Sequence, residues 1–498
     1  MTGIRIHPYD TVAVALELLT PGQTLTIPDY GTVLVREEIP AGHKIALRSH
    51  KPGERIVKYG SVIGTATAEI AAGTLVHTHN CKTNLSGTLT YTYQPAFHDL
   101  PPEPPRTFMG YRRDDGEGEG GVGIRNELWI FPTVGCVNGI VTALAAEARA
   151  KFSLKQTEIV AYTHPFGCSQ LGEDAVRTMD LLCGLIRHPN AAGVLVVGLG
   201  CENSPIPLLQ KRLGTYDPSR VRFLACQDCA DEMAAGLSIL GELCRKAETA
   251  VRTEVPLSEL VVGLKCGGSD GLSGITANPL LGVVSDRLIS MGGSTILTEV
   301  PEMFGAETLL MARCRSKTVF RKTVDMVNGF KSYFLDHGEP VGENPSPGNR
   351  AGGITTLEEK SLGCTQKGGS APVEDVLHYG EPLRTRGLSL LQAPGNDLVA
   401  STALAASGAQ LILFTTGRGT PFGSPVPTMK LSTNTALAQK KPHWIDFDAG
   451  QLLDGIPMTA LADSLLARMI AVASGTETVR SEGLSRENLA IWKDGVTL

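Results

Sequence analysis

Aromatic residues are scarce in this sequence, and no apolar run is long enough to cross a membrane. Phenylalanine, tryptophan and tyrosine make up 5% of the 498 residues, which is few for a site that stacks a flat hydrophobic cofactor. No run of about 18 or more apolar residues occurs, and residues 1–4 show no signal-peptide pattern. We therefore expect a cytoplasmic protein that has no membrane partner.

Positive charge and nucleotide-binding motifs are also lacking. The formal net charge is −6 and there is no long basic stretch, so no nucleic-acid partner is expected. No strand is followed by Gly-x-Gly-x-x-Gly and no Walker lysine occurs, which leaves nucleotide binding weakly supported. Cysteine and glycine, in contrast, are plentiful, with 11 and 56 residues. In a chain without an export signal, the cysteines are expected to be reduced.

Residues 1–95 are predicted to form a β-rich domain, because short alternating segments are separated by Pro-Gly turns. His77 and His79 alternate with Thr78, so in a strand they would face the same side, as two ligands of one metal must. Two solvent-facing histidines are the alternative. Residues 96–124 are rich in proline, glycine and charge and predict a flexible linker. Within it, residues 108–111 are the candidate for a packed connector or a lid.

From residue 125 onward, apolar strands alternate with helices, which predicts an α/β body with mostly parallel sheets. We expect a first part at 125–336 and a second at 337–498, the second beginning with a long irregular loop at 339–371. Such loops are more often functional than not. Five successive predicted strands end in a cysteine, and we expect these ends at one edge of one sheet: Cys136, Cys168, Cys201, Cys226 and Cys266.

The stretch 259–282 carries the densest chemistry. A buried strand at 260–264 is followed directly by Lys265, Cys266, two glycines, Ser269 and Asp270, as at a site on the carboxyl end of a strand. Glu299 and Glu302 follow another predicted strand and are candidates for a hard metal or for acid and base. Further binding candidates are Arg350, for a carboxylate, and Arg418, in a Gly-Arg-Gly-Thr turn.

Several blocks of the sequence resemble the altronate and galactarate dehydratase family. They span nearly the whole chain: 77–80, 108–113, 123–126, 134–138, 163–170, 264–274, 298–305 and 415–423. The resemblance implies an N-terminal β-clip domain of the antifreeze-like type, a two-part α/β catalytic body, and a hydro-lyase acting on sugar acids, usually with Fe²⁺. The chain length is closer to that of altronate dehydratases. Related sulfolactate lyases carry the two parts as separate subunits.

Dehydration beside a carboxylate needs a base, an acid for the departing hydroxyl and a cation for the enediolate. We assign Lys265 as base, with carboxylate binding as its alternative role, and His164 as acid or alternate base. The remaining catalytic and substrate-binding candidates are Asp270, Asn138, Asn203, Ser269, Arg350 and Arg418. For Fe²⁺, or Mn²⁺ in its place, we expect His77 and His79 with Glu299 or Glu302.

Other functions are compatible with the same sequence. An iron–sulfur dehydratase would use three of Cys136, Cys168, Cys201, Cys226, Cys229 and Cys266, although no ferredoxin-type spacing occurs. Galactarate dehydration, a sulfolactate-type lyase reaction and a carbohydrate-binding protein without activity are the others. The expected partner is a sugar acid, and a homo-oligomer is plausible because small domains often meet a neighbour's body.

Overall fold

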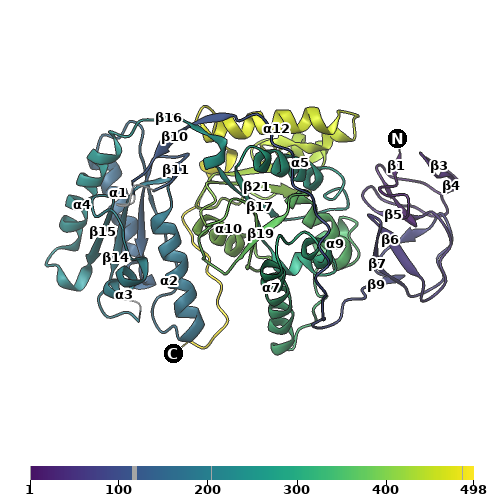
Figure 1. Ribbon diagram of the computed structural model, residues 1–498, viewed down its shortest axis with the longest axis horizontal. Helices are drawn as coiled ribbons and strands as arrows, with labels where there is room; N and C mark the ends of the chain where they lie inside the picture. Colours follow the sequence, from purple (N-terminus) through teal and green to yellow (C-terminus); the bar gives the residue numbers. More distant parts are fainter. Residues whose placement is uncertain (1, 115–119, 204, 485, 498) are drawn as a thin grey trace.

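The computed structural model describes residues 2–114, 120–203, 205–484 and 486–497. Figure 1 shows three parts side by side, and their order in space differs from their order in the chain. The strand-rich N-terminal domain and the first α/β part lie at opposite ends, and the C-terminal α/β part lies between them. None of the described helices is long and apolar enough to cross a membrane.

The N-terminal domain is built from short antiparallel strands, as predicted. Three small sheets, β1-β2-β5-β8, β3-β4 and β6-β7-β9, enclose cores of valine, isoleucine and leucine. The strands are β1 (Gly3–Ile4), β2 (Val12–Ala15), β3 (Thr24–Ile27), β4 (Gly31–Leu34), β5 (Lys44–Ala46), β6 (Arg55–Lys58), β7 (Ser61–Ala66), β8 (Leu75–Val76) and β9 (Cys81–Lys82). The expected strand through His77 and His79 is wrong. β8 ends at Val76, and a turn follows in which the amide N–H of Asn80 donates to the carbonyl of His77.

The connector after this domain is more ordered than predicted. Residues 85–106 run over the C-terminal part, where the Tyr91 hydroxyl donates to Glu307 at 2.6 Å and the Ala96 amide to the Ala312 carbonyl at 2.7 Å. Next come β10 (Thr107–Arg112) and β11 (Val122–Gly123), which form a three-stranded sheet with β16 (Thr253–Pro256). The predicted linker 96–124 is therefore a packed connector in its described residues, and residues 115–119 lie outside them.

The first α/β part is a four-stranded parallel sheet with the order β13-β12-β14-β15. Its strands are β12 (Glu127–Pro132), β13 (Glu158–Ala161), β14 (Ala191–Gly198) and β15 (Val221–Ala225), and its helices are α1 (Asn138–Lys151), α2 (Gly172–Arg187), α3 (Ile206–Leu213) and α4 (Glu232–Ala247). Helix α2 packs against α10 (Asp397–Ala406) of the C-terminal part. The last residues of the chain return to this part, where Gln170 pairs with Thr497.

The C-terminal part holds a seven-stranded parallel sheet with the order β19-β20-β18-β17-β21-β22-β23. Its strands are β17 (Val261–Cys266), β18 (Ser294–Leu297), β19 (Val373–Leu377), β20 (Gly387–Leu391), β21 (Leu411–Thr416), β22 (Thr428–Ser432) and β23 (Phe447–Asp448). Its helices are α5 (Ala277–Ser290), α6 (Glu307–Met311), α7 (Lys317–Asp336), α8 (Pro347–Ala351), α9 (Leu357–Cys364), α10 (Asp397–Ala406), α11 (Thr435–Lys440) and α12 (Met458–Ala473).

Three sequence expectations change with this topology. The body divides between β15 and β17 instead of at residue 336, because β17 and β18 pair with β21 and β20. The segment 339–371 is not one irregular loop, since it contains α8 and α9. Cys266 belongs to the second sheet, so the five strand-end cysteines do not share one edge. The α/β class with mostly parallel sheets is confirmed.

Candidate active site

The carboxyl edge of the seven-stranded sheet gathers buried charged groups and thiols. Strand β17 ends at Cys266, and after β18 the backbone of Glu299 adopts a left-handed conformation, with φ 71°. This conformation is costly for a residue with a side chain and is typical of functional sites. It brings the Glu299 carboxylate to the end of β17, where the Cys266 amide donates to it at 3.0 Å.

Lys265 is fully buried at this edge and is held as a cation. Its ammonium donates to the Glu299 carboxylate and, at 2.9 Å, to the Asp397 carboxylate. Burial opposes the charge, but Glu299 and Asp397 outweigh that effect and raise the pKa of Lys265. A protonated lysine cannot accept a proton, so these contacts argue against the expected role of Lys265 as base and show it positioning two carboxylates.

Two thiols and one carboxylate lie next to this lysine. The Cys266 sulfur is 3.4 Å from the Cys364 sulfur, and Glu302 Oε2 lies 3.0 Å and 3.1 Å from the two sulfurs. The ammonium groups of Lys360 and Lys367 close the group, at 2.6 Å from Glu302 Oε1 and 2.9 Å from the Cys266 sulfur. All five side chains are buried.

The donor set suits a divalent metal ion. Among the described residues, one group of three His, Cys, Asp or Glu side chains has its ligand atoms within 4.8 Å of one another, and it is Cys266, Glu302 and Cys364. Thiolates favour soft ions and carboxylates favour hard ions such as Mn²⁺, so this mixed set accepts a divalent first-row metal but does not select Fe²⁺. The hydrogen bond with Cys266, together with burial, raises the pKa of the Cys364 thiol, so a metal would have to displace its proton.

Charge balance permits such an ion. Three lysines at this edge contact three carboxylates: Lys265, Lys360 and Lys367 with Glu299, Glu302 and Asp397. A divalent cation adds two positive charges, and the two thiols that lose their protons to bind it add two negative charges. The buried cluster would therefore stay balanced with the ion bound, which is the condition for keeping charges in a protein interior.

A pocket of about 430 Å³ opens beside this group. Its walls include Cys266, Glu302, Lys360, Asp397 and Arg350. The Arg350 Nε atom is buried and has no hydrogen-bond partner among the described residues. The side chain of Asp397 is 38% exposed, whereas Glu299 and Glu302 are buried. Asp397 is therefore the carboxylate of this cluster that a ligand reaches most easily.

The other predicted residues of this edge have different positions. Asp270 accepts hydrogen bonds from Ser273 and Thr433 at 2.9 Å each, so its half-buried carboxylate links the loop after β17 to the residue that follows β22. Ser269 is buried, and its carbonyl accepts from Asn349. Arg418 is exposed and donates to the Gly348 carbonyl at 3.1 Å. None of Ser269, Asp270 and Arg418 lines the pocket beside Cys266.

The N-terminal domain docks next to this site through α9. Lys44 and Lys58 both pair with the buried Glu359 carboxylate, at 2.9 Å and 2.8 Å. The backbones also touch, since a Cβ at Gly271 would lie 1.9 Å from the Gly42 carbonyl oxygen. Figure 1 shows α9 between the sheet and the small domain.

Of the two predicted histidine ligands, His77 lies in this interface, and neither belongs to the thiol group. His77 Nδ1 is 3.0 Å from the Thr355 hydroxyl, and burial together with Lys44 and His43 lowers the pKa of His77 to about 4. His79 is exposed. The structure therefore does not bring His77 and His79 together with Glu299 and Glu302 into a set of ligands.

Comparison with known proteins identifies the relatives of this chain. It is 53% identical to an altronate dehydratase of Escherichia coli, over 100% of both chains, and 53% identical to an altronate dehydratase of Bacillus subtilis, over 99% of both. This chain belongs to the altronate/galactarate dehydratase family. A galactarate dehydratase (L-threo-forming) of Escherichia coli is 33% identical over 91% of this chain and 88% of its own.

Family models match the three parts in order. The altronate/galactarate dehydratase SAF domain matches residues 1–84, the second domain of D-galactarate dehydratase/altronate hydrolase matches 110–248, and the C-terminal domain of D-galactarate/altronate dehydratase matches 257–497. The predicted family and enzyme class are thus confirmed. The chain is a hydro-lyase with an N-terminal SAF domain.

The other predicted site residues of this dehydratase lie at the four-stranded sheet. The His164 imidazole is buried and contacts the Pro132 carbonyl at 2.9 Å, and burial lowers its pKa to about 4. Asn138 donates to the His164 carbonyl, and Asn203 accepts from the Ser169 amide. These contacts give His164 a role in holding loops, and the structure does not place it with Lys265.

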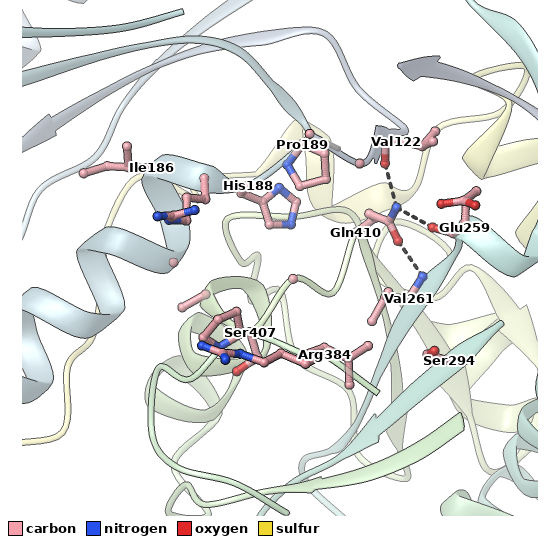
Figure 2. Close-up of a pocket in the computed structure, with 18 of the residues that line it drawn as sticks. Val122, Ile186, His188, Pro189, Glu259, Val261, Ser294, Arg384, Ser407 and Gln410 are labelled. Carbon is pink, nitrogen blue, oxygen red and sulfur yellow. Dashed lines mark hydrogen bonds between the residues drawn. The ribbon is translucent and has the colours of Figure 1, made fainter. Parts of the chain in front are cut away.

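A second pocket, of about 440 Å³, lies between the two α/β parts. Figure 2 shows Gln410 at one side of it, where its side-chain amide donates to the carbonyls of Val122 at 2.6 Å and Glu259 at 2.9 Å. The pocket lies near the amino ends of β14 and β21, as His188 and Gln410 precede these strands. Ligands of open α/β sheets bind at the carboxyl ends, so this junction is not our candidate for the dehydratase site.

Sequence reasoning missed four residues of the site: Lys360, Cys364, Lys367 and Asp397. A signal for three of them was present. Lys360, Cys364 and Lys367 are spaced by four and three residues, which places them on one face of a helix. The expectation of an irregular loop concealed that spacing. Asp397 follows a predicted turn that opens a helix, but nothing in the sequence links it to Lys265.

Proposed function

We propose that this enzyme converts D-altronate to 2-dehydro-3-deoxy-D-gluconate and water, with Fe²⁺ as cofactor and Mn²⁺ as a substitute. The two relatives at 53% identity are named altronate dehydratases, and the one named galactarate dehydratase is 33% identical. The observation that carries the assignment of the site is the pocket of about 430 Å³ beside the buried Cys266, Glu302 and Cys364 group.

Arg350 is the proposed partner of the substrate carboxylate. Its guanidinium borders the pocket with one buried N–H unpaired among the described residues, and guanidinium and carboxylate match in a bidentate pair. This pairing would fix the C2 hydrogen relative to the Asp397 carboxylate, which lines the same pocket.

Asp397 is the proposed base. It takes the proton from C2, the electrons of the broken C–H bond form the C2–C3 double bond, and the C3 hydroxyl leaves. The Lys360 ammonium gives this hydroxyl a proton, so that it departs as water. The proton taken up by Asp397 returns to Lys360 through solvent before the next turnover. The resulting enol tautomerises to the 2-keto acid. Lys265 holds Asp397 in place but also weakens it as a base, so the reaction depends on stabilising the enediolate.

Cys266, Glu302 and Cys364 would hold the metal. When bound, Fe²⁺ supplies a Lewis acid that lowers the energy of negative charge on substrate oxygen atoms. The three residues come from β17, the segment after β18 and α9, so the ion would also link the strand ends to the helix on which the SAF domain docks. All eleven cysteines are free, which supports a reducing, cytoplasmic location.

Anaerobic turnover tests this proposal. Purified protein is incubated with D-altronate or galactarate after addition of Fe²⁺ or a chelator, and the 2-keto-3-deoxy product is measured. Iron-dependent product from D-altronate is the expected result. Faster turnover of galactarate than of D-altronate would overturn the substrate assignment. Full turnover in the presence of the chelator would overturn the assignment of the metal cofactor.

A further inference from the structure

The exposed cysteines of this chain are confined to one place. Six of the eleven cysteines are buried, and the five others all follow strands of the four-stranded sheet. Cysteine is among the residue types most often buried, and exposed thiols are open to oxidation. The five are Cys136, Cys168 and Cys201, which are exposed, and Cys226 and Cys229, which are half-buried.

The sheet order makes the loops of the three exposed cysteines neighbours. Cys168 follows β13, Cys136 follows β12 and Cys201 follows β14. These strands are parallel and adjacent in the order β13-β12-β14. All three cysteines therefore lie at one edge of the sheet, with Cys136 following the middle strand.

Hydrogen bonds tie these loops together. The Gly135 amide donates to the Phe166 carbonyl at 2.8 Å, which joins the loops of Cys136 and Cys168. The Ser169 amide donates to Asn203 Oδ1 at 2.9 Å, which joins the loops of Cys168 and Cys201. Strand β12 lies between β13 and β14, so the hydrogen bond from Ser169 to Asn203 passes from one outer loop to the other. All three loops are therefore connected by hydrogen bonds.

The backbone on both sides of Cys168 adopts uncommon conformations, and one of them packs closely against the loop of Cys136. Gly167 has φ 97°, and a Cβ there would lie 2.1 Å from the Thr133 carbonyl oxygen. Ser169 adopts a left-handed conformation with φ 60°, which is uncommon for a residue with a side chain. Such conformations cluster at ligand sites, and these two positions flank Cys168.

Two buried side-chain amide atoms close in sequence to the thiols have no hydrogen-bond partner within the described part of the chain. Gln170 is 4% exposed, and its Nε2 has no hydrogen-bond partner among the described residues. The same is true of Asn138 Oδ1. Gln170 is two residues from Cys168 and Asn138 two from Cys136. A buried N–H without a partner is costly, and inorganic sulfide of an iron–sulfur cluster accepts hydrogen bonds of this kind.

We propose that Cys136, Cys168 and Cys201 bind an iron–sulfur cluster of the four-iron type. The three thiols would bind as thiolates and release three protons, and the fourth iron would take a solvent or hydroxy-acid oxygen. A single ion fits less well, because these cysteines do not form a group with ligand atoms within 4.8 Å of one another. A cluster spans a wider space between its ligands than one ion does.

Iron and acid-labile sulfide distinguish this site from the one at Cys266. The full-length protein is reconstituted anaerobically with Fe²⁺, sulfide and a thiol reductant, desalted and assayed for both elements and for visible absorption. We expect about four sulfides per chain and a broad visible band. Cys136→Ser, Cys168→Ser and Cys201→Ser should each lose most of the sulfide and the band. Iron bound at Cys266, Glu302 and Cys364 brings no sulfide.

Two variants serve as controls. Cys229→Ser changes a half-buried thiol of the same edge and should keep both sulfide and colour. Cys364→Ser should keep the sulfide but lose the iron that binds without it. Unchanged melting temperatures of the three variants at exposed positions, before reconstitution, would show that they fold. A wild type without sulfide, or a Cys168→Ser variant with as much sulfide as the wild type, would overturn the proposal.

Discussion

At the carboxyl edge of the seven-stranded sheet, Cys266 and Cys364 are buried. At the corresponding edge of the four-stranded sheet, Cys136, Cys168 and Cys201 are exposed to solvent. The first edge pairs three lysines with three carboxylates, and helix α9 and the SAF domain cover it. The loops of the second edge are joined largely by amides. Equivalent positions in two parallel sheets thus support different chemistry. The cysteines are buried where α9 and the SAF domain cover the edge, and they are exposed where no such cover is described.

Asp397→Asn should have the largest effect on activity at the charged edge. Removing the base would lower kcat by about 1000-fold, with KM nearly unchanged because Arg350 remains. Steady-state kinetics with D-altronate measure this split. Asp463→Asn is the control, since Asp463 is 65% exposed and pairs with Arg287. An Asp397→Asn enzyme with wild-type kcat would remove Asp397 from the mechanism.

Glu359→Gln tests the ion pairs that cover the charged edge. It leaves Lys44 and Lys58 without their buried partner and should lower the free energy of unfolding by about 3 kcal/mol or more. Chemical denaturation monitored by circular dichroism measures this difference. Glu54→Gln, which breaks an exposed pair with Arg48 in the same domain, should change little.

The same glutamate predicts how stability depends on pH. Burial alone would raise the pKa of Glu359, but Lys44 and Lys58 lower it from 4.5 to about 2. Its contribution is therefore present above pH 4.5 and is lost as the pH falls toward 2. Melting temperatures of wild type and Glu359→Gln should converge over that interval. A constant difference down to pH 2 would contradict the ion-pair explanation.

Cys364→Ser should lower activity by about 100-fold because it weakens metal binding. Mutation of the groups that only orient metal ligands already lowers affinity or activity by about 10- to 100-fold. Iron content after desalting and activity at saturating Fe²⁺ separate binding from chemistry. Cys314→Ser, at another buried thiol outside the site, should retain its iron. If both variants bound iron equally, the ion would have to lie elsewhere.

His77→Ala and His79→Ala should have the smallest effects. Neither side chain is in the thiol group, and His79 is exposed, so iron content should be unchanged and stability should change by about 0.5 kcal/mol or less for His79→Ala. Loss of iron in either variant would restore the histidine ligands that the sequence suggested and would move the metal site away from the buried thiols.

Local features were predictable from the sequence, and long-range partners were not. The β-rich domain, the alternating α/β body and a strand at 260–264, observed as β17 (Val261–Cys266), follow from local pattern. The role of Lys265 depends on Glu299 and Asp397, which are 34 and 132 residues away. Cys266 and Cys364 are 98 residues apart. Pairing of β17 with β18 and β21 creates these contacts, and no periodicity encodes it.

The histidine prediction failed for a local reason. Alternation places His77 and His79 on one side only if the chain is extended, and the turn closed by Asn80 ends that conformation at Val76. Asn favours such turns because its side chain bonds to nearby backbone; here Asn80 Oδ1 accepts from the His77 amide at 2.9 Å.

The connector at 85–106 makes docking of the SAF domain an intramolecular event. Because Tyr91 and Ala96 hold this segment along the C-terminal part, the domain meets α9 at a high effective concentration that dilution of the protein does not change. A chain cleaved within the segment would instead assemble as two molecules, and its activity would fall with dilution while that of the intact chain would not.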